Sequence, residues 1–512
     1  MTAVCRAIRR IPGNDRDQAT ARRHTARTAP EGHVMTASAP TAPTAPGVRS
    51  WWGIPFATAE RYRRPVVAAF DPDRPYDRKG VAPVQPDTGD WLEADSGTGE
   101  DCLNLNVWAP AQPTGTALPV AVYIHGGGFE FGANTQTTSN AAGLAASGRV
   151  VGVSVNYRLG ALGAVSLSQY GGRLAEASNL GLQDIIAALT WIQQNIASFG
   201  GDPDNVTVYG HSAGAYSTFG LLGASAADGL YRRLAGFSAG PSRLQPAWWA
   251  EELADRFVTE LGVADNPDKL IDLDPASLVT ALHKVTPTDL GVRGGMDSKS
   301  LGVVLDTAQP GAVLHAHPMD VLASGTHRDI DVLLSFASDD MGWWVANDLD
   351  RFDPHTVDRI TDEIAGWRIP RSRAKKLVAA YDQDGRTPAE IRAALLTDYI
   401  FALPAARAAL THAAAGGNAH LLAIGPAQGA PAVHGTEMYA LVGQHQPGRS
   451  PEQAERDTRI RDIVLDFATG EQARLWPAVT DRPTAESVGN LPFDAFAHYQ
   501  AALDLWANID RP

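Results

Sequence analysis

The stretch at 206–214, Val-Thr-Val-Tyr-Gly-His-Ser-Ala-Gly, constrains the fold of this chain most strongly. A β-branched and aromatic run typical of a strand leads into Gly-x-Ser-x-Gly, and an apolar pattern with helical spacing follows over 215–222. In this order the motif forms a nucleophile elbow, whereas the pentapeptide alone could be a plain glycine-rich turn. Gly210 and Gly214 would let the strand and helix approach closely around a strained Ser212. The stretch therefore predicts an exposed serine hydroxyl at a helix N-terminus.

The rest of the chain alternates predicted strands with predicted helices. Nearly unbroken apolar runs at 119–124 and 150–155 are typical of strands covered on both faces, whereas 100–108 alternates polar and apolar residues like a half-buried strand. Further short strands are predicted at 234–238, 332–336 and 420–424, the last of them closing the core. Residues 180–199 have helical spacing, with Ile185, Leu189, Ile192 and Ile196 on one stripe. This alternation predicts an α/β fold with a mostly parallel sheet.

The first 48 residues differ from the remainder. They are rich in arginine, end in an Ala/Pro/Thr repeat at 39–46, and contain no apolar segment of the kind that follows the basic part of a secretory signal. Such a composition predicts a disordered tail over 1–48. Met35 offers a second start, so Met1 and Met35 both stay open as the true N-terminus. We interpret 49–512 as one catalytic domain, with insertions over the sheet at about 241–330 and 345–415.

Composition excludes several classes of partner. A formal net charge of -14 argues against nucleic acid and against an anionic membrane surface. No run of 18 apolar residues lacks a charge or a helix breaker, so no transmembrane helix is predicted. The two cysteines, Cys5 and Cys102, do not suggest a disulfide framework, and a reducing, cytoplasmic location is expected.

A serine nucleophile needs a histidine base, and the base needs a carboxylate to orient it, in the chain order Ser, Asp/Glu, His. His434 is the candidate base because it lies in a loop of small residues after a late strand. Asp339 and Asp340 follow the 332–336 strand and are the candidate acids, although a charged pair at a strand end is often merely solvated. Of the other histidines, His125 is expected to hold the glycine loop that follows it, and the His211 ring to point away from the line of attack.

Acyl transfer also needs N–H donors aimed at the developing oxyanion. The run Gly-Gly-Gly at 126–128, directly after the 119–124 strand, exposes backbone N–H groups without side chains to block a substrate. We predict Gly127, Gly128 and Ala213 as the oxyanion hole, with a flexible loop as the alternative interpretation of the glycines.

Taken together, these motifs resemble the type B carboxylesterases, the α/β-hydrolase family that includes cholinesterases and bacterial para-nitrobenzyl-type esterases. The resemblance spans about residues 50–480. It rests on Gly-Ile-Pro-Phe-Ala at 53–57, Glu-Asp-Cys-Leu-Asn-Leu-Asn at 100–106, His-Gly-Gly-Gly-Phe at 125–129, Asn-Tyr-Arg-Leu-Gly at 156–160, Asn-Leu-Gly-Leu-Gln-Asp at 179–184, Phe-Gly-Gly-Asp-Pro at 199–203, Ser-Ala-Gly-Ala at 212–215 and His-Gly-Thr-Glu at 434–437.

The resemblance implies an α/β-hydrolase fold with large helical insertions and a triad of Ser212, Asp340 and His434. In the family the triad acid is usually the glutamate of an Asp-Glu-Gly motif. The matching stretch here is Asp-Asp-Met-Gly at 339–342, so Asp340 takes the acid position and Asp339 stays an alternative. His211 stands where the family often has glutamate, which weakens the case for a cationic substrate. The usual partner of the cysteine at position 102 is missing.

The sequence therefore predicts a serine carboxylic-ester hydrolase that works through an acyl-enzyme, without metal or cofactor, on a small apolar or aromatic ester. Five aromatic residues near the catalytic positions could line its pocket or could be ordinary core: Phe129, Tyr216, Phe336, Trp343 and Trp344. An amidase or carbamate hydrolase with the same triad stays open, as does a non-catalytic binding protein, although such relatives typically lose the serine or the histidine. Monomer and homodimer are equally compatible with the sequence.

Overall fold

The computed structural model describes residues 46–509, apart from 113–114, 242–243, 287–300, 310, 348, 368, 383–384, 472–473 and 492. The predicted tail over 1–48 therefore lies almost wholly outside the described residues, as do Cys5 and Met35. Part of the predicted insertion at 241–330 lies outside them too.

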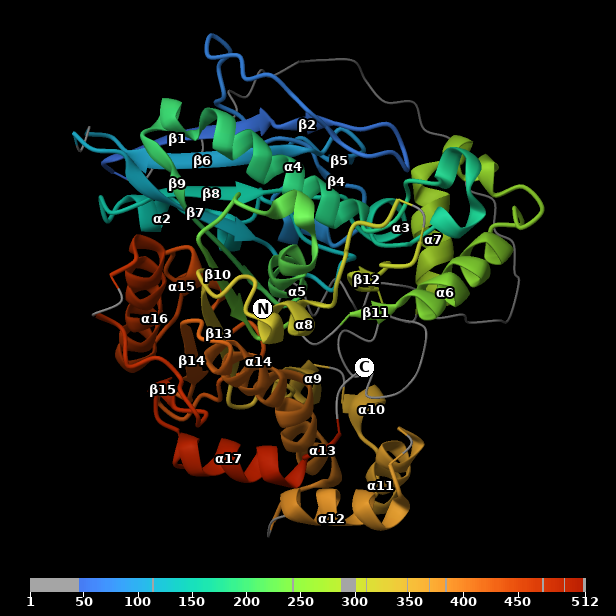
Figure 1. Cartoon of the computed structure of the whole chain (residues 1–512), viewed down its shortest axis with the longest axis vertical. Coiled ribbons are helices and arrows are strands. Elements are labelled where there is room, and N and C mark those ends of the chain that lie inside the picture. The colour runs from blue at the N-terminus through green and yellow to red at the C-terminus, as the bar shows by residue number, and fades with distance from the viewer. Residues whose placement is uncertain are drawn as a thin grey trace, which may run out of the picture.

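A nine-stranded sheet crosses the molecule (Figure 1) in the order β1-β6-β8-β7-β9-β10-β13-β14-β15. Its strands are β1 (Val48–Pro55), β6 (Asn104–Pro110), β7 (Leu118–Ile124), β8 (Val151–Val155), β9 (Gly201–His211), β10 (Arg233–Phe237), β13 (Asp331–Ala337), β14 (Ala419–Ile424) and β15 (Ala485–Val488). The β1–β6 and β6–β8 pairs are antiparallel, and the other pairs are parallel. The mostly parallel sheet predicted from the alternation of strands and helices is confirmed.

Two strand predictions were wrong. The strand predicted to be half-buried, β6, is buried along almost its whole length because it lies between β1 and β8 and is covered on both faces. Its polar side chains are satisfied internally: the Asn106 amide donates to the Asn134 carbonyl oxygen at 2.9 Å. The 420–424 run is not the last core strand, since β15 pairs with it in parallel about sixty residues later.

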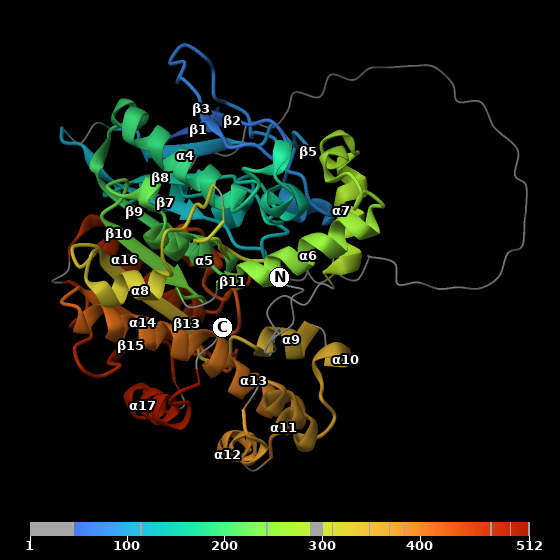
Figure 2. The same ribbon diagram turned by 45° about the vertical axis from the view of Figure 1, so that its right-hand side comes forward.

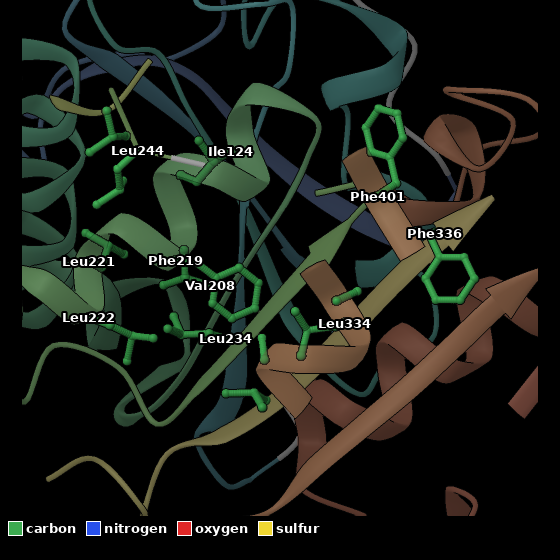
Figure 3. Close-up of a cluster of buried hydrophobic side chains, with 14 of the residues drawn as sticks. Ile124, Val208, Phe219, Leu221, Leu222, Leu234, Leu244, Leu334, Phe336 and Phe401 are labelled. Atoms are coloured by element: carbon green, nitrogen blue, oxygen red, sulfur yellow. The ribbon is translucent and has the colours of Figure 1, made fainter. Parts of the chain in front are cut away.

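Helices cover both faces of the sheet. Along β7, Val120, Val122 and Ile124 belong to a core cluster shared with α4 (Leu180–Asn195), α5 (Ala213–Gly220) and α14 (Leu403–Ala414). The alternate residues Ala121 and Tyr123 belong to a second cluster, shared with α2 (Ala142–Ala145), α15 (Met438–Leu441) and α16 (Pro451–Thr469). Figure 3 shows the first cluster, in which Phe219 of α5 lies beside Val208 of β9 and Leu234 of β10.

Smaller elements complete the fold beside and below the sheet (Figures 1 and 2). The short strands are β2 (Ala57–Thr58), β3 (Val66–Val67), β4 (Ala82–Pro83), β5 (Thr98–Gly99), β11 (Gln245–Pro246) and β12 (Val304–Leu305). The remaining α-helices are α3 (Gly160–Gly163), α6 (Ala247–Glu260), α7 (Pro275–Val285), α8 (Pro318–Ser324), α9 (Gly342–Asn347), α10 (Leu349–Phe352), α11 (Val357–Gly366), α12 (Arg371–Tyr381), α13 (Pro388–Thr397) and α17 (Ala495–Leu505). In both views α6 and α7 lie together at one side of the sheet, and α11 and α12 lie at the lower end. The helices α3, α6 and α7 share a core cluster of their own.

One long helical segment runs over Pro388–Ala414, through α13, a π-helical turn at Asp398–Ala402 and α14. It is long and apolar enough to cross a membrane by composition, but 83% of its most apolar window is buried inside the protein. It is therefore a core helix of this fold. The π-helical turn, a feature often found at functional sites, places the Phe401 ring beside that of His434.

Candidate functional site

Ser212 occupies the turn between β9 and α5. Its backbone has φ 54° and ψ -123°, a strained conformation for a residue with a side chain. The turn is fixed by hydrogen bonds: the Ser212 N–H donates to the Phe237 carbonyl oxygen at 2.9 Å, and the Ser212 carbonyl oxygen accepts from Ala215 and Tyr216. This conformation is maintained by the surrounding sheet and is the geometry of a nucleophile elbow.

The two glycines of the motif are sterically required. A Cβ on Gly210 would lie 2.5 Å from the carbonyl carbon of Gly214, and a Cβ on Gly214 would lie 2.1 Å from the carbonyl oxygen of Ile124. The end of β7 thus packs directly against the beginning of α5. This close approach brings the glycine loop after β7 next to Ser212.

The three predicted triad side chains form one hydrogen-bonded chain. His434 Nε2 lies 2.9 Å from Ser212 Oγ, and His434 Nδ1 lies 2.9 Å from Asp340 Oδ1. Asp340 is fully buried, and its Oδ2 accepts from the Ala337 N–H at 2.8 Å. The His434 N–H also donates to the Asp340 carbonyl oxygen at 3.2 Å. Because both ends of the imidazole are held, the ring is oriented to take a proton from Ser212.

Asp339, the alternative acid, lies apart from this chain. Its carboxylate lies close to the Gly342 backbone, since a Cβ added at Gly342 would lie only 2.1 Å from Asp339 Oδ2. Burial, followed by the charge of Asp340, raises the pKa of Asp339 to about 6. The geometry therefore places Asp340, and not Asp339, on His434.

The glycine loop that contains Gly127 and Gly128 begins beside the nucleophile elbow, and Ala213 follows Ser212 directly. A Cβ on Gly126 would meet the His211 carbonyl oxygen at 2.6 Å and Ser212 Cβ at 3.1 Å, so the glycine loop lies against the elbow. Within residues 46–509 as described, the N–H groups of Gly127, Gly128 and Ala213 donate no hydrogen bond to the protein. They are therefore free to donate to the oxyanion of a tetrahedral intermediate whose carbon is bonded to Ser212 Oγ.

Gly127→Ala is expected to lower kcat for an ester at least about 100-fold, the loss typical of one oxyanion donor. Gly127 has φ +118°, and its Cβ would lie 2.1 Å from the Phe131 carbonyl oxygen, so the loop must move. Gly148→Ala is the matched control, because Gly148 also has positive φ (+76°) but open space around it. The measurement is kcat of the two variants and of wild type, with their melting temperatures compared to show that all are folded. If Gly127→Ala keeps activity within a few fold of wild type, Gly127 is not part of the oxyanion hole.

Aromatic rings surround the His434 imidazole. Ring centroids of Trp344 and Phe401 lie 5.3 Å from it, and that of His211 lies 4.7 Å from it. We expected the His211 ring to point away from the line of attack, and the structure places it beside the base. Phe401 was not predicted as a site residue.

The five aromatic residues proposed for the pocket divide into two groups. Trp343 packs edge-on against Trp344, which contacts His434, and Phe129 packs against the small cluster containing Tyr216 at the start of α5. Phe336 is different: it is fully buried and its ring packs edge-on against Tyr499, 4.7 Å away. Phe336 is therefore core.

His125 has the structural role predicted for it. Its ring stacks on Tyr157 at 4.6 Å, and its Nδ1 lies 2.9 Å from the Gly126 carbonyl oxygen at the start of the glycine loop. Burial lowers the pKa of His125 to about 4, so the ring is neutral. It supports the loop and carries no charge near the serine.

Comparisons with known proteins place the chain in one family. The model of the carboxylesterase family matches residues 23–485. The para-nitrobenzyl esterase of Bacillus subtilis is 32% identical over 368 residues, which cover 70% of this chain and 71% of that protein. Among solved structures, the Geobacillus stearothermophilus carboxylesterase EST55 at pH 6.2 superposes with a TM-score of 0.77 at 28% identity, covering 90% of this chain and 96% of the other. A PNB esterase superposes with a TM-score of 0.76 at 27% identity, covering 90% and 97%. Because the family model matches most of the chain and the solved relatives share its fold, the chain belongs to the carboxylesterase family and is a carboxylesterase of the α/β-hydrolase fold.

Proposed function

We propose that the protein hydrolyses carboxylic esters through a Ser212–His434–Asp340 triad and an acyl-enzyme. The observation that carries the proposal is the pair of 2.9 Å contacts that connect His434 with Ser212 Oγ and with Asp340. A serine hydroxyl is a weak nucleophile near neutral pH, and a histidine at this distance can remove its proton as attack begins.

The steps follow from the positions of these groups. His434 Nε2 takes the proton from Ser212 Oγ, which attacks the ester carbonyl carbon, and the N–H groups of Gly127, Gly128 and Ala213 stabilise the oxyanion. His434 then donates the proton to the leaving alcohol. In the second half, His434 removes a proton from water, which hydrolyses the acyl-enzyme and frees Ser212. The Asp340 carboxylate stabilises the imidazolium in both halves of the reaction.

The substrate class we propose is a small ester with an apolar or aromatic group. Support comes from aromatic side chains close to the triad. Trp344 and Phe401 lie against His434, and Phe129 packs against the cluster at the start of α5. Flat rings of this kind bind apolar groups and offer no charge to a polar one. A relative named for para-nitrobenzyl ester cleavage fits the same preference.

The direct test is a series of para-nitrophenyl esters of graded acyl length, run beside a para-nitroanilide of the same acyl group. We expect ester cleavage with a burst of nitrophenol equal to the enzyme concentration, and much slower cleavage of the anilide. Faster cleavage of the anilide would make the protein an amidase. No cleavage of either substrate, together with no labelling of Ser212 by a fluorophosphonate, would make it a binding protein.

A further inference from the structure

A second histidine and a second carboxyl group lie beside the triad, and the mechanism above uses neither. His211, the residue immediately before the nucleophile, is only 3% exposed, and its ring centroid is 4.7 Å from that of His434, at an angle of 45°. Its position is fixed, because β9 pairs here with β10, where His211 lies opposite Phe237. His211 therefore forms one wall around the catalytic base.

Glu437 lies on the other side of His211. It follows His434 by three residues and is fully buried, and its Oε1 accepts from Ser238 Oγ at 3.1 Å. The same oxygen is 3.7 Å from His211 Nε2. Within the part of the chain that the structure describes, neither His211 Nε2 nor Glu437 Oε2 has a hydrogen-bond partner. Because an unsatisfied polar atom is costly in a protein interior, two such groups facing each other indicate a functional pair.

The charges around the pair indicate how many protons it holds. Burial, followed by His434, keeps the pKa of His211 well below its usual range, so this ring is neutral. Burial, followed by the charge of Asp340, raises the pKa of Glu437 to about 7. Tyr123, whose pKa is raised by burial and by Glu437, stays neutral as well. Near neutral pH, Glu437 therefore holds a proton part of the time and faces an imidazole that can accept a hydrogen bond.

We propose that His211 and Glu437 form a second histidine–carboxyl dyad that positions His434 for ester hydrolysis, with Glu437 orienting the His211 ring and His211 holding the His434 ring. The inference rests on the triad proposed above. Both are positioning residues, since neither touches the reacting atoms.

Such a dyad is needed because the His434 ring could otherwise rotate out of line. Asp340 holds His434 at Nδ1, and the ring must still keep Nε2 on the line between Ser212 Oγ and the leaving group as the proton moves twice. Trp344 and Phe401 pack against the ring as well, and His211 is the neighbour that lies beside a carboxyl group, with its Nε2 3.7 Å from Glu437 Oε1. A neutral His211 does not repel the imidazolium that forms at His434, and an ionised Glu437 attracts it.

The first test is Glu437→Gln, which keeps the shape and removes the titrating group. We expect kcat to fall about 10- to 30-fold, equivalent to about 1.4–2 kcal/mol, with KM unchanged within twofold. In wild type, log(kcat/KM) should fall more steeply on the acid side than in Glu437→Gln, because the raised pKa of Glu437 adds a second titrating group there. Asp339→Asn, which removes a neighbouring carboxyl with a raised pKa that does not contact His434, should keep the wild-type slope.

The second test is a double-mutant cycle with His211→Phe, which keeps a ring against His434 and removes the nitrogens. If the two residues act as one dyad, the double variant loses no more kcat than the more damaging single variant. Losses that multiply, or a Glu437→Gln enzyme with wild-type kcat and slope, would overturn the dyad. An active Ser212→Ala enzyme would instead overturn the triad itself, so the two failures are distinguishable.

Folding of the variants is checked by the pH dependence of melting. The folded-state pKa of Glu437 is raised from 4.5 to about 7, so the folded state binds this proton more tightly than the unfolded state. Wild type therefore loses stability as pH rises through about 7, and Glu437→Gln should melt at a higher temperature than wild type at pH 8. If Glu437→Gln has a low kcat and melts at a higher temperature than wild type at pH 8, it is folded and His434 is no longer held in position. If it melts at a lower temperature than wild type at pH 8, the buried dyad is contradicted.

Discussion

Replacing Ser212 with alanine is expected to lower kcat for para-nitrophenyl esters by about 10⁵- to 10⁶-fold, because nucleophile and base act as one unit. The substitution removes one oxygen atom and leaves the strained backbone of the elbow with a residue of similar size. KM should change little, since the oxyanion donors and the aromatic walls remain. The rate is measured with active-site titration, so that trace wild-type enzyme is not counted as residual activity.

The control for this substitution is Ser225→Ala, which removes a hydroxyl from an exposed serine away from the site and should keep full activity. A fluorophosphonate probe should label wild type and Ser225→Ala, and should not label Ser212→Ala. More than about 1% residual activity in a titrated Ser212→Ala enzyme would contradict the acyl-enzyme mechanism, because water attack on a merely bound ester is far slower than that.

The second large effect separates the two adjacent aspartates. Asp340→Asn should lower kcat about 10⁴-fold, because an amide in place of the carboxylate favours the wrong tautomer of His434 and no longer stabilises its imidazolium. Asp339→Asn should stay within a few fold of wild type, because that carboxylate does not contact His434. The measurement is kcat for both variants at one and the same pH.

Asp339→Asn should also reveal itself through stability. The folded-state pKa of Asp339 is raised from 3.8 to about 6, so the wild-type carboxyl favours the folded state at low pH and disfavours it above about 6. At pH 8 we expect Asp339→Asn to be more stable by about 1–2 kcal/mol, after allowance for the solvent that reaches this partly exposed group. A variant as active as wild type but no more stable would contradict the burial of this carboxyl, and an inactive one would make Asp339 the triad acid.

The parts of the fold that could be predicted from sequence were those encoded locally. The elbow around Ser212 is specified by two glycines and the strand and helix beside them, and β7 and β8 by short apolar runs. The environment of β6 was mispredicted because alternation indicates one solvated face, whereas here its polar residues are buried and hydrogen-bonded. The last strand, β15, was missed because its four residues include no apolar run.

The candidate site shows the same limit. The order of the residues and their places at strand ends predicted that Ser212 and His434 would meet one of two aspartates, and the family resemblance implied Asp340. The sequence could not predict which aromatic residues would surround them. Phe336 lies in β13 only four residues before Asp340, yet its ring points into the core (Figure 3), because side-chain direction alternates along a strand. Phe401 reaches the triad through the packing of a distant segment, and the pairing of Glu437 with His211 depends on β9 and the His434 loop coming together.

The separation of the triad along the chain has a consequence for biosynthesis. Ser212 and His434 are 222 residues apart, and the base arrives only when β14 has paired in parallel with β13. Pairings of such long sequence separation form late and slowly. A nascent chain thus carries its nucleophile and glycine loop for much of its synthesis without a base to activate them. Esterase activity in a refolding sample should therefore report the docking of the C-terminal third, and an arrested or truncated chain would hold an inert serine.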